Sequence, residues 1–116
     1  MLAKKCLGNW GEDRAALYMR KKGYQLIARQ WRHGRYELDL IFYYPGLIVA
    51  VEVKTRSQNY NSNTPLLSSD QVKRLRLALL SFCRQKGHLY RQSRLDLITL
   101  TKNPDRIFTL RHYPDI

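Results

Sequence analysis

The stretch from Tyr36 to Arg56 constrains the fold most, because it holds two strongly apolar runs joined by a turn. It reads YELDLIFYYPGLIVAVEVKTR, in which the apolar runs 38–44 and 47–53 flank Pro45-Gly46. Two such runs around a turn-forming pair predict a β-hairpin. A hydrophobic hairpin has no packing reason to carry charges, yet four charged residues interrupt this one: Glu37, Asp39, Glu52 and Lys54.

The length of the turn decides which of these charged residues face each other. If Pro45-Gly46 forms the whole loop, Asp39 lies opposite Glu52 and Glu37 lies opposite Lys54. Because side chains two residues apart share a face of a strand, all four would project from one side of the sheet. Pro-Gly favours a type II turn, however, and an odd loop would put Asp39 and Glu52 out of line.

The predicted pairing of Asp39 with Glu52 calls for a positive group between the two side chains. Directly opposed residues have Cβ atoms about 5 Å apart, and like charges at that separation destabilise a sheet. Lys54 is one candidate, and a divalent cation is the other, because Mg²⁺ and Mn²⁺ prefer oxygen ligands. The alternative is an ordinary solvated face. Against it, the remaining residues of that face are mostly apolar: Ile41, Tyr43, Ile48 and Ala50.

The ordered motifs of the chain resemble a known family. An acidic residue, a hairpin and then Glu-x-Lys are similar to the signature of the PD-(D/E)xK nuclease superfamily, here Asp39 followed by Glu52 and Lys54. The fuller set resembles the YraN family of small, largely uncharacterised bacterial proteins: Gly8, Gly11-Glu12, Ala15, Gly23-Tyr24, Glu37–Ile41, Val51–Arg56 and Arg94–Asp96. The chain departs from its relatives at Tyr36, where they mostly have Gly.

This resemblance implies a Holliday-junction-resolvase-like fold and a metal-dependent nuclease. It assigns catalytic roles to Glu12, Asp39, Glu52 and Lys54, with Mg²⁺ or Mn²⁺ held by Asp39, Glu52 and Glu12. The carboxylate of Glu12 would come from the first helix over the hairpin. The alternative for Glu12 is a first-turn acid stabilised by the helix dipole.

The net charge of the chain indicates what kind of molecule it binds. The chain of 116 residues has a formal net charge of +12 and a pI near 10.1. Such a balance favours a polyanionic partner, and nucleic acid, most of all DNA, ranks above an acidic membrane surface. No stretch approaches the ~20 apolar residues of a membrane span, and the N-terminus lacks a signal-peptide core, so the expected location is cytoplasmic.

Several residues are candidates for contacts with nucleic acid. Arg32 and Arg35 belong to a basic turn before the hairpin, and Arg56 follows the Glu-x-Lys motif. The superfamily uses a Gln or Lys near the start of the second helix, which adds Gln71 and Lys73. A polar segment between the hairpin and this helix predicts a flexible flap that contacts DNA through Asn59, Tyr60 and Asn61.

The remaining patterns complete an α/β fold in a single domain, residues 1–116. They predict a helix over 7–22 closed by Gly23, strands over 24–31, 91–100 and 106–112, and a helix over 69–86 opened by a capping box at Ser68 and Gln71. With the hairpin, the order is αβββαββ, which favours a mixed central β-sheet flanked by helices, as in restriction-endonuclease-like and resolvase-like cores.

Three functions are compatible with these patterns. The leading hypothesis is a divalent-metal-dependent endonuclease, with branched DNA suggested by fold analogy alone. The second is a non-catalytic nucleic-acid-binding module that keeps the nuclease fold. The third is a basic adaptor for acidic partners, which leaves the charged hairpin unexplained. Leu77 and Leu80 on the polar side of the second helix hint at a homodimer contact.

Overall fold

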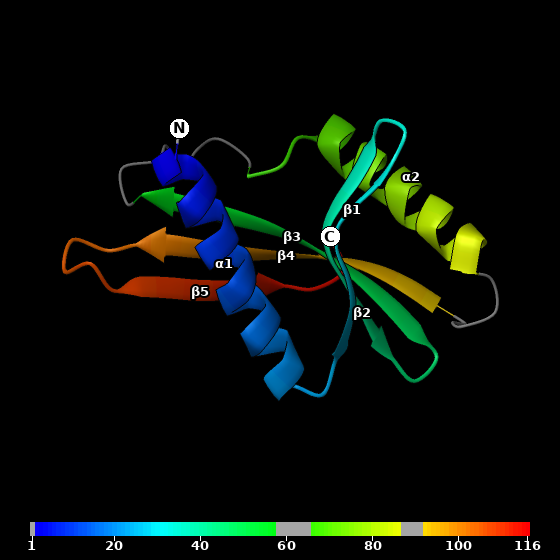
Figure 1. Cartoon of the computed structure of the whole chain (residues 1–116), viewed down its shortest axis with the longest axis horizontal. Helices are drawn as coiled ribbons and strands as arrows, with labels where there is room; N and C mark the ends of the chain where they lie inside the picture. Colours follow the sequence, from blue (N-terminus) through cyan, green and yellow to red (C-terminus); the bar gives the residue numbers. More distant parts are fainter. Residues whose placement is uncertain (1, 58–65, 87–91) are drawn as a thin grey trace.

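The protein forms a five-stranded mixed sheet with two helices (Figure 1). The computed structural model describes residues 2–57, 66–86 and 92–116, with side chains from Asn9 onward. The elements in chain order are α1 (Leu2–Lys21), β1 (Gln25–His33), β2 (Tyr36–Tyr44), β3 (Leu47–Ser57), α2 (Ser69–Lys86), β4 (Gln92–Lys102) and β5 (Phe108–Tyr113). Strand order in the sheet follows chain order; β3 and β4 are parallel, and all other neighbours are antiparallel. The predicted α/β fold and element order are confirmed.

The helices cover opposite faces of the sheet, as the alternation along β3 shows. Ile48 and Ala50 belong to an apolar cluster with Phe82 of α2, whereas Val49 and Val51 pack in a second cluster that includes α1. Because successive side chains of a strand point to opposite faces, one apolar run can serve both cores. In the parts of the chain that the structure describes, no helix is long and apolar enough to cross a membrane.

The end of α1 follows the prediction, but its start does not. Gly23 adopts a φ of +97°, and the Tyr24 N–H donates to the Met19 carbonyl at 3.2 Å, which is the helix-ending bond of a Schellman motif. The helix begins at Leu2, well before the predicted Leu7. Glu12 therefore lies in mid-helix, and its explanation as a first-turn acid is wrong.

The capping box of α2 forms as predicted. The Gln71 N–H donates to Ser68 Oγ at 3.1 Å, and the Ser68 N–H donates to Gln71 Oε1 at 2.8 Å. Leu77 and Leu80 are exposed on the outer side of α2, and a homodimer through them stays a prediction. The predicted flap residues Asn59, Tyr60 and Asn61 lie outside the described residues.

The central hairpin has the predicted register, and then its strands separate. Pairs run from Tyr44 with Leu47 to Leu40 with Val51. The φ of +78° at Gly46 suits the third position of a type II turn, so that turn and a two-residue loop coexist here. Beyond Val51, β3 continues to pair with β4, while the β1–β2 hairpin rises beside α2 (Figure 1). We call this divergence of β2 from β3 the fork. Glu37 and Lys54 lie on its two sides and, contrary to the prediction, do not pair with each other.

Close packing of α1 on β3 depends on Gly11. A Cβ atom at Gly11 would lie 2.3 Å from Thr55 Oγ1 and 3.3 Å from Leu100 Cδ1. The first distance is far inside van der Waals contact, so any side chain at Gly11 requires movement. The absence of a side chain at this position lets α1 bring the adjacent Glu12 down to the sheet.

We expect Gly11→Ala to destabilise the protein by about 1 kcal/mol, because the clash with Thr55 outweighs the better helix propensity of Ala. In a Thr55→Ala background the same change should become stabilising, by up to about 1 kcal/mol. Urea unfolding of the parent, the two single variants and the double variant measures both changes in the free energy of unfolding. Thr55→Ser retains Oγ and is the matched control, in which the sign should not reverse; equal effects of Gly11→Ala in all three backgrounds would contradict this packing.

Candidate functional site: carboxylates at the fork

Asp39 lies where the β2–β3 ladder ends. Its Oδ2 accepts a hydrogen bond from the Val53 N–H at 2.9 Å. The side chain of one strand thus satisfies a backbone donor of the other after the backbone pairing has stopped at Leu40 and Val51. This bond fixes the Asp39 carboxylate next to the residue that precedes Val53, which is Glu52.

Glu52 and Asp39 form a close pair of acidic groups. The pKa of Glu52 is raised to about 9; burial is the largest cause, and a hydrogen bond with the Asp39 side chain and repulsion from the Asp39 charge are the next two. The positive charge of Lys54 opposes this shift. The pair therefore holds a proton at neutral pH, at a position where a cation could replace that proton.

Glu12 reaches the same region from α1. It is 9% exposed, and its Oε1 accepts hydrogen bonds at 3.4 Å from Arg29 Nη2 and from Gln30 Nε2. Burial raises the pKa of Glu12 most, and the charge of Asp39 is the next cause. The neighbouring Asp13 is exposed and pairs with Arg29 at 2.6 Å. As predicted, only one of the two adjacent acids approaches the fork, and it is Glu12.

Gln30 reaches Glu12 through an irregular backbone in β1. The strand register shifts between Leu26 and Ala28, and Gln30 adopts a φ of +48°. Arg29 and Gln30 consequently both contact Glu12 on the α1 side, while Trp31 packs on Phe82 of α2. Sequence reasoning missed both partners of Glu12, because a glutamine within a strand gives no sign of a left-handed conformation.

A cavity opens at the fork on the α2 side. Its volume is about 160 Å³, and it is lined by Arg35, Tyr36, Glu37, Glu52, Gln71, Arg74 and Leu75. Arg35 and Gln71, two of the predicted nucleic-acid contacts, thus line the same cavity as Glu52, and the Gln71 side chain also caps α2. Of the basic residues on α2 that the structure describes, Arg74 lines this cavity and the predicted Lys73 does not.

The two other predicted nucleic-acid contacts have local partners. Arg32 is exposed and pairs with Glu37 at 3.3 Å. Arg56 Nη2 donates to the Leu66 carbonyl at 3.4 Å, which ties the end of β3 to the segment before α2. Arg32 remains accessible to a ligand, whereas this bond gives Arg56 a structural role.

Arg94 and Asp96 pair with each other, as one alternative predicted. Arg94 donates to both carboxylate oxygens at 2.8 and 2.9 Å, and the buried Asp96 also contacts His112 at 2.7 Å and accepts the Asp115 N–H at 3.0 Å. Burial alone would raise the pKa of Asp96, but these hydrogen bonds together lower it. The group joins β4 to β5 and the C-terminal segment, which is a structural role.

The fork contains two carboxylates in contact and a third nearby. In the described ranges, no three acidic, histidine or cysteine side chains converge as a complete metal site. Asp39 and Glu52 supply the oxygen donors, and Glu12 is held by Arg29 and Gln30. One or two carboxylates suit Mg²⁺, which usually completes its shell with water and substrate phosphate.

Comparison with known proteins identifies relatives over nearly the whole chain. The model of UPF0102, an uncharacterised protein family, matches residues 11–100. A UPF0102 protein of Nitratidesulfovibrio vulgaris (strain DP4) is 37% identical over 114 residues, covering 97% of this chain and 84% of the relative. One from Chloroflexus aurantiacus (strain J-10-fl) is 36% identical over 112 residues, covering 94% and 90%. These bacterial names state the family and no activity.

The raised pKa of Glu52 predicts a pH-dependent stability. The folded state keeps this proton above the ordinary value of 4.5, so its contribution to stability falls as the pH rises through the range from 4.5 to about 9. In EDTA, Glu52→Gln should therefore be more stable than the parent at pH 8, by roughly 2 kcal/mol, and similar at pH 4. Urea unfolding at several pH values measures this difference. Glu37→Gln, at the half-exposed neighbour, is the control; a Glu52→Gln effect independent of pH would contradict the assignment.

Proposed function

This chain belongs to the uncharacterised protein family UPF0102, which is the YraN family that its motifs resemble, and we propose that it is a divalent-metal-dependent endonuclease acting on DNA. The observation that carries the proposal is the Asp39–Glu52 pair at the fork, beside Lys54. Two carboxylates in contact destabilise a fold unless a proton or cation lies between them. Their retention in a part-buried site is explained by a role in binding a cation.

The donor set fits Mg²⁺ or Mn²⁺. Asp39 and Glu52 offer hard oxygen ligands, and Glu12 could join them if it left Arg29 and Gln30. When bound, the ion would supply Lewis-acid polarisation of the scissile phosphate and ease deprotonation of the attacking water. This arrangement also supports our placement of the chain in the PD-(D/E)xK superfamily.

The protein groups around the fork have distinct tasks in this proposal. Lys54 follows Glu52 by two residues and lies close enough to influence its pKa, so its ammonium can stabilise charge that develops on the phosphate. Arg35 and Arg74 line the fork cavity and can contact neighbouring phosphates, and Arg32 and Lys73 are exposed basic residues that do not line it. The net charge of +12 strengthens binding to any nucleic acid in a salt-dependent way.

A second candidate function is a nucleic-acid-binding module without catalysis. The observation that favours it is the engagement of Glu12 by Arg29 and Gln30, which leaves two carboxylates rather than three at the fork. Such a module would keep the basic surface but would not require a cation.

Branched DNA is our preferred substrate within the nuclease proposal, by resemblance to resolvases.

We expect metal-dependent cleavage of at least one substrate in a labelled panel of four-way junction, flap, duplex and single strand. Lys54→Ala should lower the cleavage rate at least about 100-fold, because it removes a group aimed at the transition state, and should leave binding within about threefold. Lys102→Ala, an exposed lysine at the end of β4, is the charge-matched control with unchanged cleavage. If Lys54→Ala cleaved as fast as the parent, Lys54 would have no catalytic role.

Metal binding separates the two candidate functions without any cleavage assay. Calorimetry should show Mn²⁺ binding that is weakened at least about tenfold by Asp39→Asn, which removes one charged ligand. Because Glu52 holds a proton at neutral pH, binding should release a proton and tighten as the pH rises toward 9. Asp105→Asn, in the turn before β5, is the matched control. Absence of Mn²⁺ binding by the parent would favour the non-catalytic module.

A further inference from the structure

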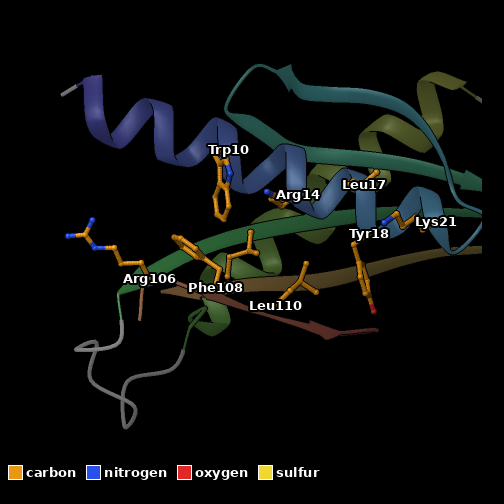
Figure 2. Close-up of a pocket in the computed structure, with 9 residues that line it drawn as sticks. Trp10, Arg14, Leu17, Tyr18, Lys21, Arg106, Phe108 and Leu110 are labelled. Atoms are coloured by element: carbon orange, nitrogen blue, oxygen red, sulfur yellow. The ribbon is translucent and has the colours of Figure 1, made fainter. Parts of the chain in front are cut away.

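A second concave surface lies between α1 and β5, apart from the fork (Figure 2). It has a volume of about 460 Å³, within the range of about 300–1,000 Å³ for small-ligand sites. Three aromatic residues and three basic residues give it its character: Trp10, Tyr18, Phe108, Arg14, Lys21 and Arg106. We call this surface the aromatic groove. Of the described residues that line it, none is acidic.

The groove and the fork use different faces of α1. Trp10, Arg14, Tyr18 and Lys21 recur at helical spacing and line the groove. Glu12 lies on another face of the same helix, toward Arg29 and Gln30. A ligand in the groove is therefore not a ligand of the carboxylate pair, and the residues of the groove are not used by the proposed cleavage chemistry.

Aromatic rings and cations contact each other in the groove. The Trp10 and Phe108 rings are 4.3 Å apart between centroids, and the Arg14 guanidinium lies 5.3 Å from the Trp10 centroid. Figure 2 shows Trp10 and Tyr18 projecting from α1 toward β5, where Phe108 and Leu110 face them. The Trp10 and Phe108 rings are tilted by 51° and Arg14 lies over the Trp10 ring, so the groove combines aromatic and cationic groups, the two kinds of group that bind the base and the phosphate of a nucleotide.

A chain of hydrogen bonds through His112 to Asp96 fixes the position of Tyr18. Its hydroxyl forms a hydrogen bond with His112 Nδ1 at 3.2 Å, and His112 Nε2 in turn contacts the buried Asp96 at 2.7 Å. The Tyr18 ring is thereby held in place before any ligand arrives. Preorganised rings lower the entropic cost of stacking a ligand.

Arg106 has an unusual backbone for its residue type. It adopts a φ of +67° in the turn between β4 and β5, where its N–H donates to the Asn103 carbonyl at 3.0 Å. Glycine or asparagine would adopt this conformation at lower cost. A long cationic side chain at a strained position on the rim of the groove is explained if that side chain binds something.

We propose that the aromatic groove binds single-stranded nucleic acid by stacking unpaired bases on Trp10 and Phe108 while Arg14 and Arg106 contact phosphates. The proposal rests on the proposed function in taking nucleic acid as the ligand, and it narrows the substrate class to DNA with an unpaired segment. An acidic peptide would use the cations but not the ring faces, and a lipid surface would require a flat or convex site.

The test measures binding in EDTA, so that cleavage cannot intervene. A short oligothymidylate and an abasic strand of the same length carry the same phosphates, and the parent should bind the abasic strand about 10-fold more weakly because stacking is lost. Trp10→Ala should weaken oligothymidylate binding about 10-fold and abolish the difference between the strands, whereas Trp10→Phe should retain it. Arg84→Ala, an exposed cation on α2, is the control for charge alone.

A second variant guards against loss of folding. Arg106→Gly relieves the positive φ, so Tm should be unchanged or higher, while oligothymidylate affinity should fall severalfold.

In a Trp31→Phe protein, Trp10 is the only remaining tryptophan, and oligothymidylate should quench its fluorescence. Equal affinity of the parent for both strands, or equal binding of poly-glutamate, would overturn the proposal.

The binding test of the aromatic groove and the cleavage test of the fork can fail separately. Base-dependent binding that Trp10→Ala abolishes, in a protein that never cleaves, would support the groove and refute the endonuclease. Lys54-dependent cleavage without base-dependent binding would support the endonuclease and refute the groove.

Discussion

The contact between Asp39 and Glu52 is the constraint on which the rest of the site depends. Two acidic groups in hydrogen-bond contact in a part-buried site cannot both be charged without a compensating cation, and burial together with the contact to Asp39 raises the pKa of Glu52. The fold must supply the stability that opposes it. Both apolar clusters, one on each face of the sheet, extend up to the fork through Leu38, Leu40 and Val51. The two apolar clusters therefore supply the stability that holds the two carboxylates together.

Separation of two strands is what makes the carboxylates accessible. If β2 and β3 had stayed paired, Asp39 and Glu52 would lie on a continuous sheet beneath α2. Because the part of β2 that precedes Leu40 is not paired with β3, the Asp39 side chain reaches the Val53 amide, and the fork is open to Glu12 on the α1 side and to Arg74 on the α2 side. The site therefore draws on both layers of helices, which no uninterrupted hairpin would permit.

Local rules predicted much of this arrangement from sequence. The hairpin register followed from alternation and a two-residue turn, and the ends of α1 and α2 followed from Gly23 and from the Ser68–Gln71 box. The point at which β2 leaves β3 could not be predicted, because it is set by packing of the hairpin against α2 rather than by any turn residue. The same holds for the left-handed Gln30 and for the choice of Arg74 over Lys73, which depends on the rotation of α2 about its axis.

Helix α1 contributes residues to both the fork and the aromatic groove. Gly11 sets its distance from β3 through contact with Thr55, and the residues on either side of Gly11 face opposite ways: Glu12 toward the fork and Trp10 toward the aromatic groove. The position of α1 on the sheet therefore sets the place of Glu12 at the fork and of Trp10 in the groove. The charge of Asp39 contributes to the raised pKa of Glu12, so the electrostatics of the fork depend on this same placement of α1. The sheet-facing glycine thus positions one helix that contributes residues to both surfaces.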